Sequence, residues 1–302
     1  MYINTYESKQ TGSGVLRVDF REYDQPPTGV IYTVGYHLGS MATPSVTVAV
    51  ATYDPDDQLR AALDSIAAQR YDGPISAVVL DNTETPAADG IVDEFPFAEY
   101  HWQLDHVPRQ STGMANLAVA RDLGVQFADG DYVHFLNDDD VLDPDAISKK
   151  IDSIYQHPQA RGAYSAIQKA DGTVKHVPQV VLDNPLTFTL ANLRPPTLPS
   201  ALLVDREVLL DCPPRRTLPH EDICGLIEIL LRTPLAYVDE PLLRRTTPPG
   251  MSTGQASQQG RLDTHERYAG LRAELLKSQL QHHAQQTADQ LRQALTADER
   301  EQ

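Results

Sequence analysis

The chain has 302 residues, of which 41% are hydrophobic, and a formal net charge of −17 from 42 acidic and 25 basic residues. A chain of this length can bury a substantial core in one or two domains. The acidic excess argues against a nucleic-acid partner, because a phosphate backbone needs a cationic surface. It does not exclude a nucleotide-sugar, because a bound metal can supply the local positive charge. Two cysteines, Cys212 and Cys224, are too few for a disulfide framework.

The sequence shows no pattern typical of a secretory signal or a membrane-spanning helix. No apolar run approaches the roughly 20 residues that cross a bilayer. The stretch 1–7 lacks the basic region followed by an apolar run that marks a secretory signal. We therefore expect no integral membrane segment and a cytoplasmic location.

Residues 1–44 are predicted to form an extension before the main domain. The stretches 15–20 and 30–36 are typical of strands, and the Pro- and Gly-containing stretch 24–29 between them indicates a turn. A two-stranded hairpin is marginally stable alone. This β extension is therefore expected to pack on the main body or on another subunit.

The main domain opens with a strand-helix-strand unit. The β-branched, apolar stretch 46–51 predicts a strand that is buried on both faces. Asp54 is expected to cap the following helix and Pro55 to be its first residue. A second buried strand, 75–80, ends at Asp81. This order predicts a parallel sheet with a right-handed crossover.

The central feature of the sequence is an apolar stretch, 130–136, that leads through Asn137 to Asp138, Asp139 and Asp140. Three adjacent carboxylates repel one another, so a cation is expected close to them. The carboxyl end of a strand in an α/β sheet is also where ligands bind. The stretch therefore predicts a divalent metal that holds a phosphate, with a solvated turn as the alternative.

An arginine is expected on the buried face of the helix that precedes this stretch. The helix is predicted over about 111–128, and Arg121 falls on the same face as Met114 and Leu117. Because a buried arginine is seldom unpaired, we expect Arg121 to meet a carboxylate of the aspartate cluster or of an adjacent strand. An ion pair that fixes a loop is favoured over direct contact with a ligand.

The second half of the chain offers weaker signals. Asp171-Gly172 predicts a hairpin between 163–170 and 174–181. Glu221 and Asp222 begin a helix after a Pro-rich loop, where acidic residues ordinarily stabilise the helix end. The stretch 244–254 is expected to be a polar loop, and the chain beyond it a helical tail.

The order of these motifs carries more information than any one of them. Together they resemble the inverting glycosyltransferases of family 2, which have the GT-A fold, over roughly residues 45–254. The resemblance implies an α/β fold with a Rossmann-like, mostly parallel sheet. It implies a nucleotide-sugar and metal half at 45–140, an acceptor half at 141–254 and a helical tail at 255–302. The matching stretches are Thr52-Tyr53, Asp81-Asn82, Gly113 with Ala120-Arg121-Asp122-Leu123-Gly124, residues 130–140 and Glu221-Asp222.

The resemblance implies roles in donor binding for residues of the first half. Thr52, Tyr53 and Asp81 would hold the nucleotide base, with uracil, and so a UDP-sugar, favoured. Asp138 would approach the ribose or the metal. Asp139 would be the main ligand of Mn²⁺ or Mg²⁺, with Asp140 beside it, and which pair forms the D-x-D motif stays open because Asn137 stands where the family often has Asp.

In the second half, the resemblance implies that Asp222 is the catalytic base and that Glu221 helps to position it or the acceptor. Arg244, Arg245 and Ser252 would lie in a loop that closes over the diphosphate. The acceptor is left open between a glycan, a lipid-linked molecule and a small molecule. A homo-oligomer through the N-terminal extension or the C-terminal helix is a further expectation.

Two other functions compete with this reading. A non-catalytic relative could bind a sugar or nucleotide without turnover, and the intact acidic motifs argue against it. A sugar nucleotidyltransferase would need a Gly-rich loop with a cation after the first strand, but residues 51–55 contain neither. A calcium loop at Asp138 lacks the required Gly and Glu.

Overall fold

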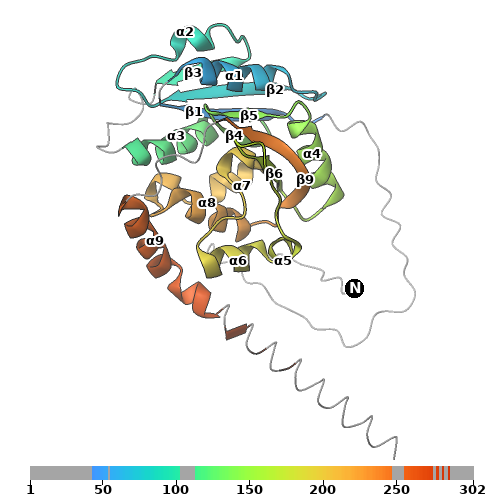
Figure 1. The fold of residues 1–302 in the computed structure, drawn as a ribbon, viewed down its shortest axis with the longest axis vertical. Coiled ribbons are helices and arrows are strands. Elements are labelled where there is room, and N and C mark those ends of the chain that lie inside the picture. Colours follow the sequence, from blue (N-terminus) through green and yellow to red (C-terminus); the bar gives the residue numbers. More distant parts are fainter. Residues whose placement is uncertain are drawn as a thin grey trace, which may run out of the picture. The chain divides into compact units, whose positions relative to one another are not determined.

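The computed structural model describes residues 43–53, 55–102, 113–246, 255–274, 277–278, 281 and 285, without the side chains of 113–116 and 255–259. The elements in this part of the chain are labelled in Figure 1. All but the last two residues of the predicted N-terminal β extension lie outside the described residues, so that prediction stays untested.

The predicted strand-helix-strand unit is present. β1 (Val46–Thr52) is buried along its whole length and pairs in parallel with β2 (Ile75–Asp81), with α1 (Asp57–Ala67) as the crossover. The helix begins later than predicted, because its N-cap is Asp56, whose carboxylate accepts a hydrogen bond of 2.6 Å from the amide of Gln58. Asp54, the predicted cap, lies outside the described residues.

The first half of the sheet is parallel throughout. Its strand order is β3-β2-β1-β4, and all three of its strand pairs run parallel. The carboxyl ends of these strands therefore share one edge of the sheet. The further elements of this half are α2 (Asp89–Val92), β3 (Ala98–Trp102), α3 (Gly113–Phe127) and β4 (Tyr132–Asn137).

The second half of the sheet is mixed. The order continues β4-β8-β6-β9-β5, with β8 antiparallel to both β4 and β6, β9 parallel to β6, and β5 antiparallel to β9. The elements are β5 (Asp140–Leu142), α4 (Ala146–Gln156), β6 (Gly162–Gln168), β7 (Val174–Lys175), α5 (Gln179–Leu182), α6 (Pro185–Asn192), β8 (Leu203–Asp205), α7 (Arg206–Asp211), α8 (Glu221–Leu230), β9 (Ala236–Arg245) and α9 (Gln255–Arg267), with 3-10 turns at Pro199–Ala201 and Arg215–Thr217.

The hairpin predicted around Asp171-Gly172 forms, but its second strand is shorter than expected. Only Val174–Lys175 pairs with β6, and the residues from Gln179 belong to α5. Pro178 explains the difference, because proline has no amide hydrogen for a ladder and its fixed φ suits a helix start. Its carbonyl accepts hydrogen bonds from the amides of Val181 and Leu182.

Helices cover both faces of the sheet. Alternate residues of β1 and β4 pack against α1 and α4 on one face. The residues between them, including Val133 and Phe135, pack on the other face, where α3, α7 and α8 gather (Figure 1). The predicted C-terminal helical region begins with α9, and Tyr268 just after it packs with Ile223 of α8. Within the described residues, no helix is long and apolar enough to span a bilayer.

One buried polar pair lies between the sheet and α4. Lys150 and His134 are both fully buried, and the Lys150 Nζ lies 2.7 Å from the His134 Nε2. The His134 Nδ1 lies 2.8 Å from the carbonyl oxygen of Phe135, which can only accept, so Nδ1 carries the ring proton and Nε2 accepts from Lys150. Burial lowers the pKa of Lys150 to about 7, and burial and the lysine charge lower the pKa of His134.

This pair predicts how stability depends on pH. The pKa of Lys150 is lower in the folded chain than in the unfolded chain, where it is near 10.4. Between about pH 7 and 10 the unfolded state therefore binds more protons, and folding stability rises with pH. We expect the Lys150→Met variant to lack this rise, as measured by urea unfolding at pH 7 and 9.5. Equal pH dependence in the two proteins would contradict the assignment.

Candidate active site

The predicted site residues of the first half meet at one edge of the sheet. Strand register places Thr52 beside Asp81, and Ala51 beside Asn137. The carboxyl ends of β1, β2 and β4 therefore bring Thr52, Asp81 and the start of the aspartate cluster together. This is the edge at which α/β sheets bind ligands.

Asp138 is fixed by the end of β1. Its Oδ2 accepts hydrogen bonds from the Thr52 hydroxyl at 2.6 Å and from the Tyr53 amide at 3.3 Å. Burial raises the pKa of Asp138 above its ordinary value, against the lowering effect of the Thr52 hydrogen bond, and the charges of Asp139 and Asp56 raise it further. The ring of Tyr53 is 62% exposed, so a planar ligand ring could stack on it.

Asp140 lies at the start of β5 and is fully buried. Both of its carboxylate oxygens lack a well-formed hydrogen bond, and so does the Nε of Arg245, which lies 3.6 Å from Oδ1. Burial raises the pKa of Asp140 to about 6, although the Ser200 hydroxyl that faces it acts in the opposite direction. Orphaned carboxylate oxygens of this kind fit a cation or a water that arrives with a ligand.

The carboxylates of the described residues do not by themselves form a closed metal cage. No group of three or more His, Cys, Asp or Glu side chains there is arranged to hold an ion. Mg²⁺ and Mn²⁺ are commonly held by one or two carboxylates together with substrate phosphates. Asp138, half-exposed Asp139 and the orphaned oxygens of Asp140 fit such a site, in which the ligand completes the coordination.

Asp81 is fully buried and its hydrogen-bonding capacity is used within the protein. One carboxylate oxygen accepts from the amide and hydroxyl of Thr83, and the other accepts from the Ala87 and Ala88 amides and the Tyr100 hydroxyl. Burial alone would raise its pKa, but these hydrogen bonds outweigh burial and lower it. In this arrangement Asp81 shapes the loop after β2, so any effect on a bound base acts through that loop.

Arg121 is buried and paired with carboxylates, as predicted, but those carboxylates belong to α8 and not to the aspartate cluster or an adjacent strand. Its Nη1 donates to the carboxylate of Glu221 and, at 2.7 Å, to Oδ1 of Asp222. Its Nη2 donates to Oδ1 of Asn137 at 3.2 Å, directly before Asp138. A side chain of α3 that is 5% exposed thus links the start of α8 to the carboxyl end of β4.

Glu221 and Asp222 differ in their surroundings. The side chain of Glu221 is 14% exposed and that of Asp222 is 37% exposed. Burial opposes ionisation of Asp222, but the charge of Arg121 outweighs it and lowers its pKa, whereas burial raises the pKa of Glu221. Asp222 is therefore the ionised and accessible carboxylate of the pair.

A second arginine supports this cluster and was not predicted from the sequence. Arg215 is 6% exposed, and its Nη1 lies 3.4 Å from the Glu221 carboxylate. Its guanidinium lies over the ring of Phe135 at 4.7 Å, and its amide donates to Asp122. The available signal was an Arg-Arg pair between prolines shortly before the acidic motif, which alone resembles a solvated loop.

The predicted loop residues Arg244, Arg245 and Ser252 do not lie together in a loop that the structure describes. Arg244 and Arg245 belong to β9, paired with Val141 and Asp140 of β5, while Ser252 lies outside the described residues. The strand continues this far because it pairs with β5 and β6. Successive residues of a strand face opposite sides. Arg245 faces Asp140, and Arg244 points elsewhere.

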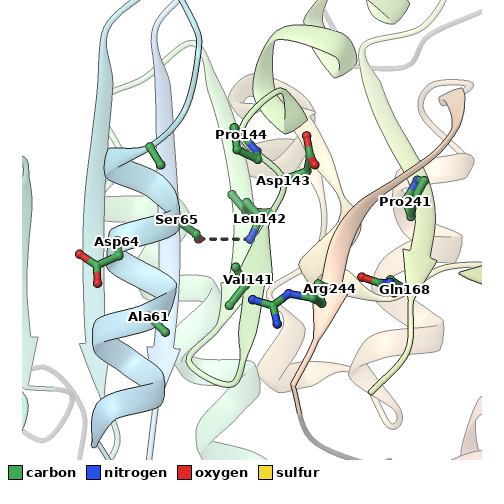
Figure 2. Close-up of a pocket in the computed structure, with 11 residues that line it drawn as sticks. Ala61, Asp64, Ser65, Val141, Leu142, Asp143, Pro144, Gln168, Pro241 and Arg244 are labelled. Carbon is green, nitrogen blue, oxygen red and sulfur yellow. Dashed lines mark hydrogen bonds between the residues drawn. The ribbon is translucent and has the colours of Figure 1, made fainter. Parts of the chain in front are cut away.

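Arg244 lines a surface groove of about 460 Å³ between α1 and strands β5 and β9. Figure 2 shows its side chain reaching from β9 toward Val141 and α1, and the Ser65 hydroxyl within 3.1 Å of the Leu142 amide. The groove lies at the α1 face, whereas Arg121 and Asp222 lie at the α3 and α8 face. Arg244 was expected in a loop that closes over the diphosphate, but it lies in β9 and lines this groove.

Solved structures of several glycosyltransferases have the same architecture. Staphylococcus aureus TarS 1–349, in complex with UDP-GlcNAc, matches with a TM-score of 0.52 and 19% identity over 70% of this chain and 61% of that chain. Glucosyl-3-phosphoglycerate synthase from Mycobacterium tuberculosis, in complex with Mn²⁺, UDP and glucosyl-3-phosphoglycerate, matches with a TM-score of 0.53 and 17% identity over 74% of this chain and 80% of that chain. At these identities the likeness shows the fold, which is the GT-A fold expected from the sequence.

Sequence comparison leads to the same family. Glycosyltransferase GlyA of Streptococcus pneumoniae is 31% identical over 129 residues, which are 42% of this chain and 18% of that protein. The chain therefore matches only a small part of this relative's length. The model of glycosyl transferase family 2 matches residues 47–203, more than half of the chain. The chain belongs to glycosyl transferase family 2.

Proposed function

We propose that the chain is a metal-dependent inverting glycosyltransferase that moves a sugar from a nucleotide-diphosphate donor, with a UDP-sugar favoured, to an acceptor hydroxyl. The observation that carries the proposal is the Arg121 bridge. It joins Asp222, an accessible ionised carboxylate, to Asn137, the residue before the aspartate cluster. In this proposal the general base and the cation site for the diphosphate are adjacent, as transfer between two substrates requires.

Two observations support the choice of donor. TarS and the glucosyl-3-phosphoglycerate synthase, which share the fold, were solved with UDP-GlcNAc and with UDP and Mn²⁺ respectively. In this chain, the exposed ring of Tyr53 follows β1 at the ligand-binding edge, where a base could stack. Thr52 holds Asp138 at the same place, so the ribose would lie near that carboxylate.

Asp222 acts as the general base in this proposal. Its carboxylate removes the proton from the acceptor hydroxyl, whose oxygen then attacks the anomeric carbon on the side opposite the leaving diphosphate and inverts it. A positioned base of this kind contributes roughly 10²–10⁴-fold to the rate. Arg121 keeps Asp222 ionised and oriented, and Glu221 completes the ion pair that holds Arg121 in place.

In this proposal, the cation beside the diphosphate would be held by Asp138, Asp139 and Asp140. A divalent cation held there supplies electrostatic stabilisation to the leaving diphosphate. Arg245 lies 3.6 Å from Asp140 and adds a fixed positive charge beside the same site. The roles in donor binding of Ser252, Arg244 and Asp81 remain proposals. The expected cytoplasmic location and oligomerisation are also proposals.

Donor binding should depend on metal. We expect UDP at about 100 times its Kd to stabilise the protein by about 2.7 kcal/mol with Mn²⁺ present, and far less after EDTA treatment, as read from thermal unfolding. The Asp139→Ala variant should lose the metal-dependent part. The Asp57→Asn variant, which changes a fully exposed carboxylate on α1, is the matched control and should respond like the parent. Equal stabilisation by UDP with and without Mn²⁺ would contradict metal dependence.

A further inference from the structure

The carboxylate of Glu221 is held by two arginines, one on each of its oxygens. Arg121 of α3 donates to Oε1, and Nη1 of Arg215 lies 3.4 Å from Oε2 and 3.4 Å from the carbonyl oxygen of the same residue. Arg121 also donates to Asp222. We call Arg121, Arg215, Glu221 and Asp222 the charge cluster.

The two arginines of the charge cluster balance its two carboxylates. With both carboxylates ionised the cluster is neutral, whereas without Arg215 it would carry one negative charge in excess. Such an excess is costly where the side chains of Arg121 and Arg215 are only 5% and 8% exposed. Burial raises the pKa of both carboxyl groups, and the charges of Arg121 and then Arg215 act against it. Arg215 is therefore the cation that allows Arg121 to be shared between Glu221 and Asp222.

Helix α8 leaves room for the Arg215 guanidinium at Gly225. A side-chain carbon at this position would lie 2.8 Å from Cζ of Arg215, closer than two such atoms can approach. Glycine inside a helix destabilises it relative to alanine, so its presence here has a packing reason. Because Gly225 lies one turn after Glu221 on α8, the guanidinium can lie against the helix beside that carboxylate.

The other sides of Arg215 are fixed by β4 and α3. Its Cζ lies 4.7 Å from the centre of the Phe135 ring, a cation–π contact. Oδ1 of Asp122 accepts from the Arg215 amide at 2.7 Å, and Oδ2 accepts from the Arg216 amide at 3.2 Å. Because Asp122 directly follows Arg121, α3 orients both arginines of the charge cluster. These contacts hold the guanidinium in one place beside Glu221.

We propose that Arg215 is a positioning residue for the general base. It holds Glu221 through the carboxylate oxygen that Arg121 does not contact, so that Arg121 stays directed at Asp222 while Asp222 takes the proton of the acceptor hydroxyl. The inference rests on the proposed glycosyltransferase function and adds a residue that acts through Glu221 and Arg121. It also explains Gly225 and Asp122 together, since one provides space for the guanidinium and the other fixes the loop that carries it.

Other titratable groups lie close to the charge cluster. His220, directly before α8, interacts with Asp222, and burial lowers its pKa, so it is neutral at pH 7. Burial raises the pKa of Asp122 and of the Cys212 thiol, and the charge of Arg215 opposes both shifts. Asp122 can therefore also titrate differently once Arg215 is removed. For this reason the experiment follows the Asp222 carboxyl itself as well as the rate.

Three variants test the role of Arg215. Arg215→Met removes the cation, Arg215→Lys keeps the charge, and Gly225→Ala displaces the guanidinium without removing any charge. One control is Arg232→Met, which removes a partly buried arginine that pairs with Glu228 toward the other end of α8. The other is Gly90→Ala, where nothing lies within 4 Å of the added carbon.

Each protein is measured in three ways: kcat for sugar transfer against pH, the Kd of UDP with Mn²⁺, and the pKa of the Asp222 carboxyl by carbon-13 NMR, with Asp222→Asn identifying the signal. We expect Arg215→Met to lower kcat at pH 7 about tenfold or more. The acid limb of kcat and the pKa of Asp222 should move up by about one pH unit, with the Kd of UDP unchanged. Arg215→Lys should recover part of the loss, Gly225→Ala should shift both quantities in the same direction, and the controls should match the parent.

A folded Arg215→Met variant that is less stable but keeps the parental kcat and the parental pKa of Asp222 would give Arg215 a structural role only and overturn the proposal. A rise in the Kd of UDP in proportion to the loss of kcat would assign Arg215 to donor binding and overturn it as well. If Arg215→Met does not fold, Gly225→Ala decides by the same criteria. A parent protein that transfers no sugar would count against the proposed function alone, because the NMR titration of Asp222 still tests the effect of Arg215.

Discussion

The Asp222→Asn variant is expected to lose about 10²–10⁴-fold in kcat for sugar transfer while it binds UDP with Mn²⁺ as the parent does. The amide keeps the size of the side chain and can still contact Arg121, but it cannot take a proton from the acceptor hydroxyl. Because the side chain of Asp222 is 37% exposed, we expect the loss of its charge to have little effect on the stability of the fold. The measurement is single-turnover transfer from a radiolabelled donor.

The matched control is Asp211→Asn, which changes an exposed carboxylate on α7 that is paired with Arg232. It should transfer sugar at the parent rate. If Asp222→Asn also transfers at the parent rate, Asp222 is not the base. If it loses UDP binding in the same proportion, its role is in donor binding, and the mechanism proposed here is wrong.

Arg121→Gln is expected to lower the free energy of unfolding by about 3–5 kcal/mol, because it leaves the largely buried Glu221 carboxylate with only the more distant Arg215, 3.4 Å away, as a cation. Arg121 is 5% exposed and contacts Glu221, Asp222 and Asn137. By comparison, Arg60→Gln breaks exposed pairs with Asp57 and Glu94 and should cost less than about 1 kcal/mol. Urea unfolding at pH 7 measures both.

The same variant should change the dependence on pH. Arg121 lowers the pKa of Asp222 in the folded state, so the ion pair stabilises the protein at neutral pH, and this stabilisation is lost as the pH falls below about 4. Without Arg121, that acid loss should shrink, and the acid limb of kcat against pH should move to higher pH. The double variant with Glu221→Gln should recover part of the stability. A variant as stable as the parent, with an unmoved acid limb, would show that Arg121 does not hold the pair.

Local sequence patterns predicted the strands of the first half well because they are short, apolar and separated by clear helix signals. The stretches 46–51, 75–80 and 130–136 became β1, β2 and β4, and their carboxyl ends meet as a parallel sheet requires. The burial of Arg121 also followed from its place on the apolar face of α3. Its partners were predicted wrongly: a carboxylate of the aspartate cluster or of an adjacent strand was expected, but Arg121 pairs with Glu221 and Asp222 of α8, because the choice among carboxylates depends on how α8 packs.

The second half was harder to predict because long-range pairing decides it. Arg244 and Arg245 begin the Pro-containing, polar stretch 244–254, which was predicted to be a loop, but pairing with β5 and β6 extends β9 through both and sends them to opposite faces. The family resemblance implies that Asp81 helps to hold the nucleotide base, and this role stays a proposal. Its carboxylate accepts five hydrogen bonds from the following loop and from Tyr100, and no local sequence pattern reveals them.

The anomeric configuration of the bond that the protein forms tests the proposed inverting transfer most directly. It is determined by NMR on the first product from a panel of α-linked UDP-sugars, with GDP- and dTDP-sugars beside them. A glycan, a lipid-linked molecule and small hydroxyl compounds serve as the acceptors. We predict a β-linked product from a UDP-sugar, with no product from Asp222→Asn on the same timescale. A product that retains the α configuration would contradict direct attack assisted by Asp222, and binding of UDP without turnover of any donor would favour the non-catalytic relative.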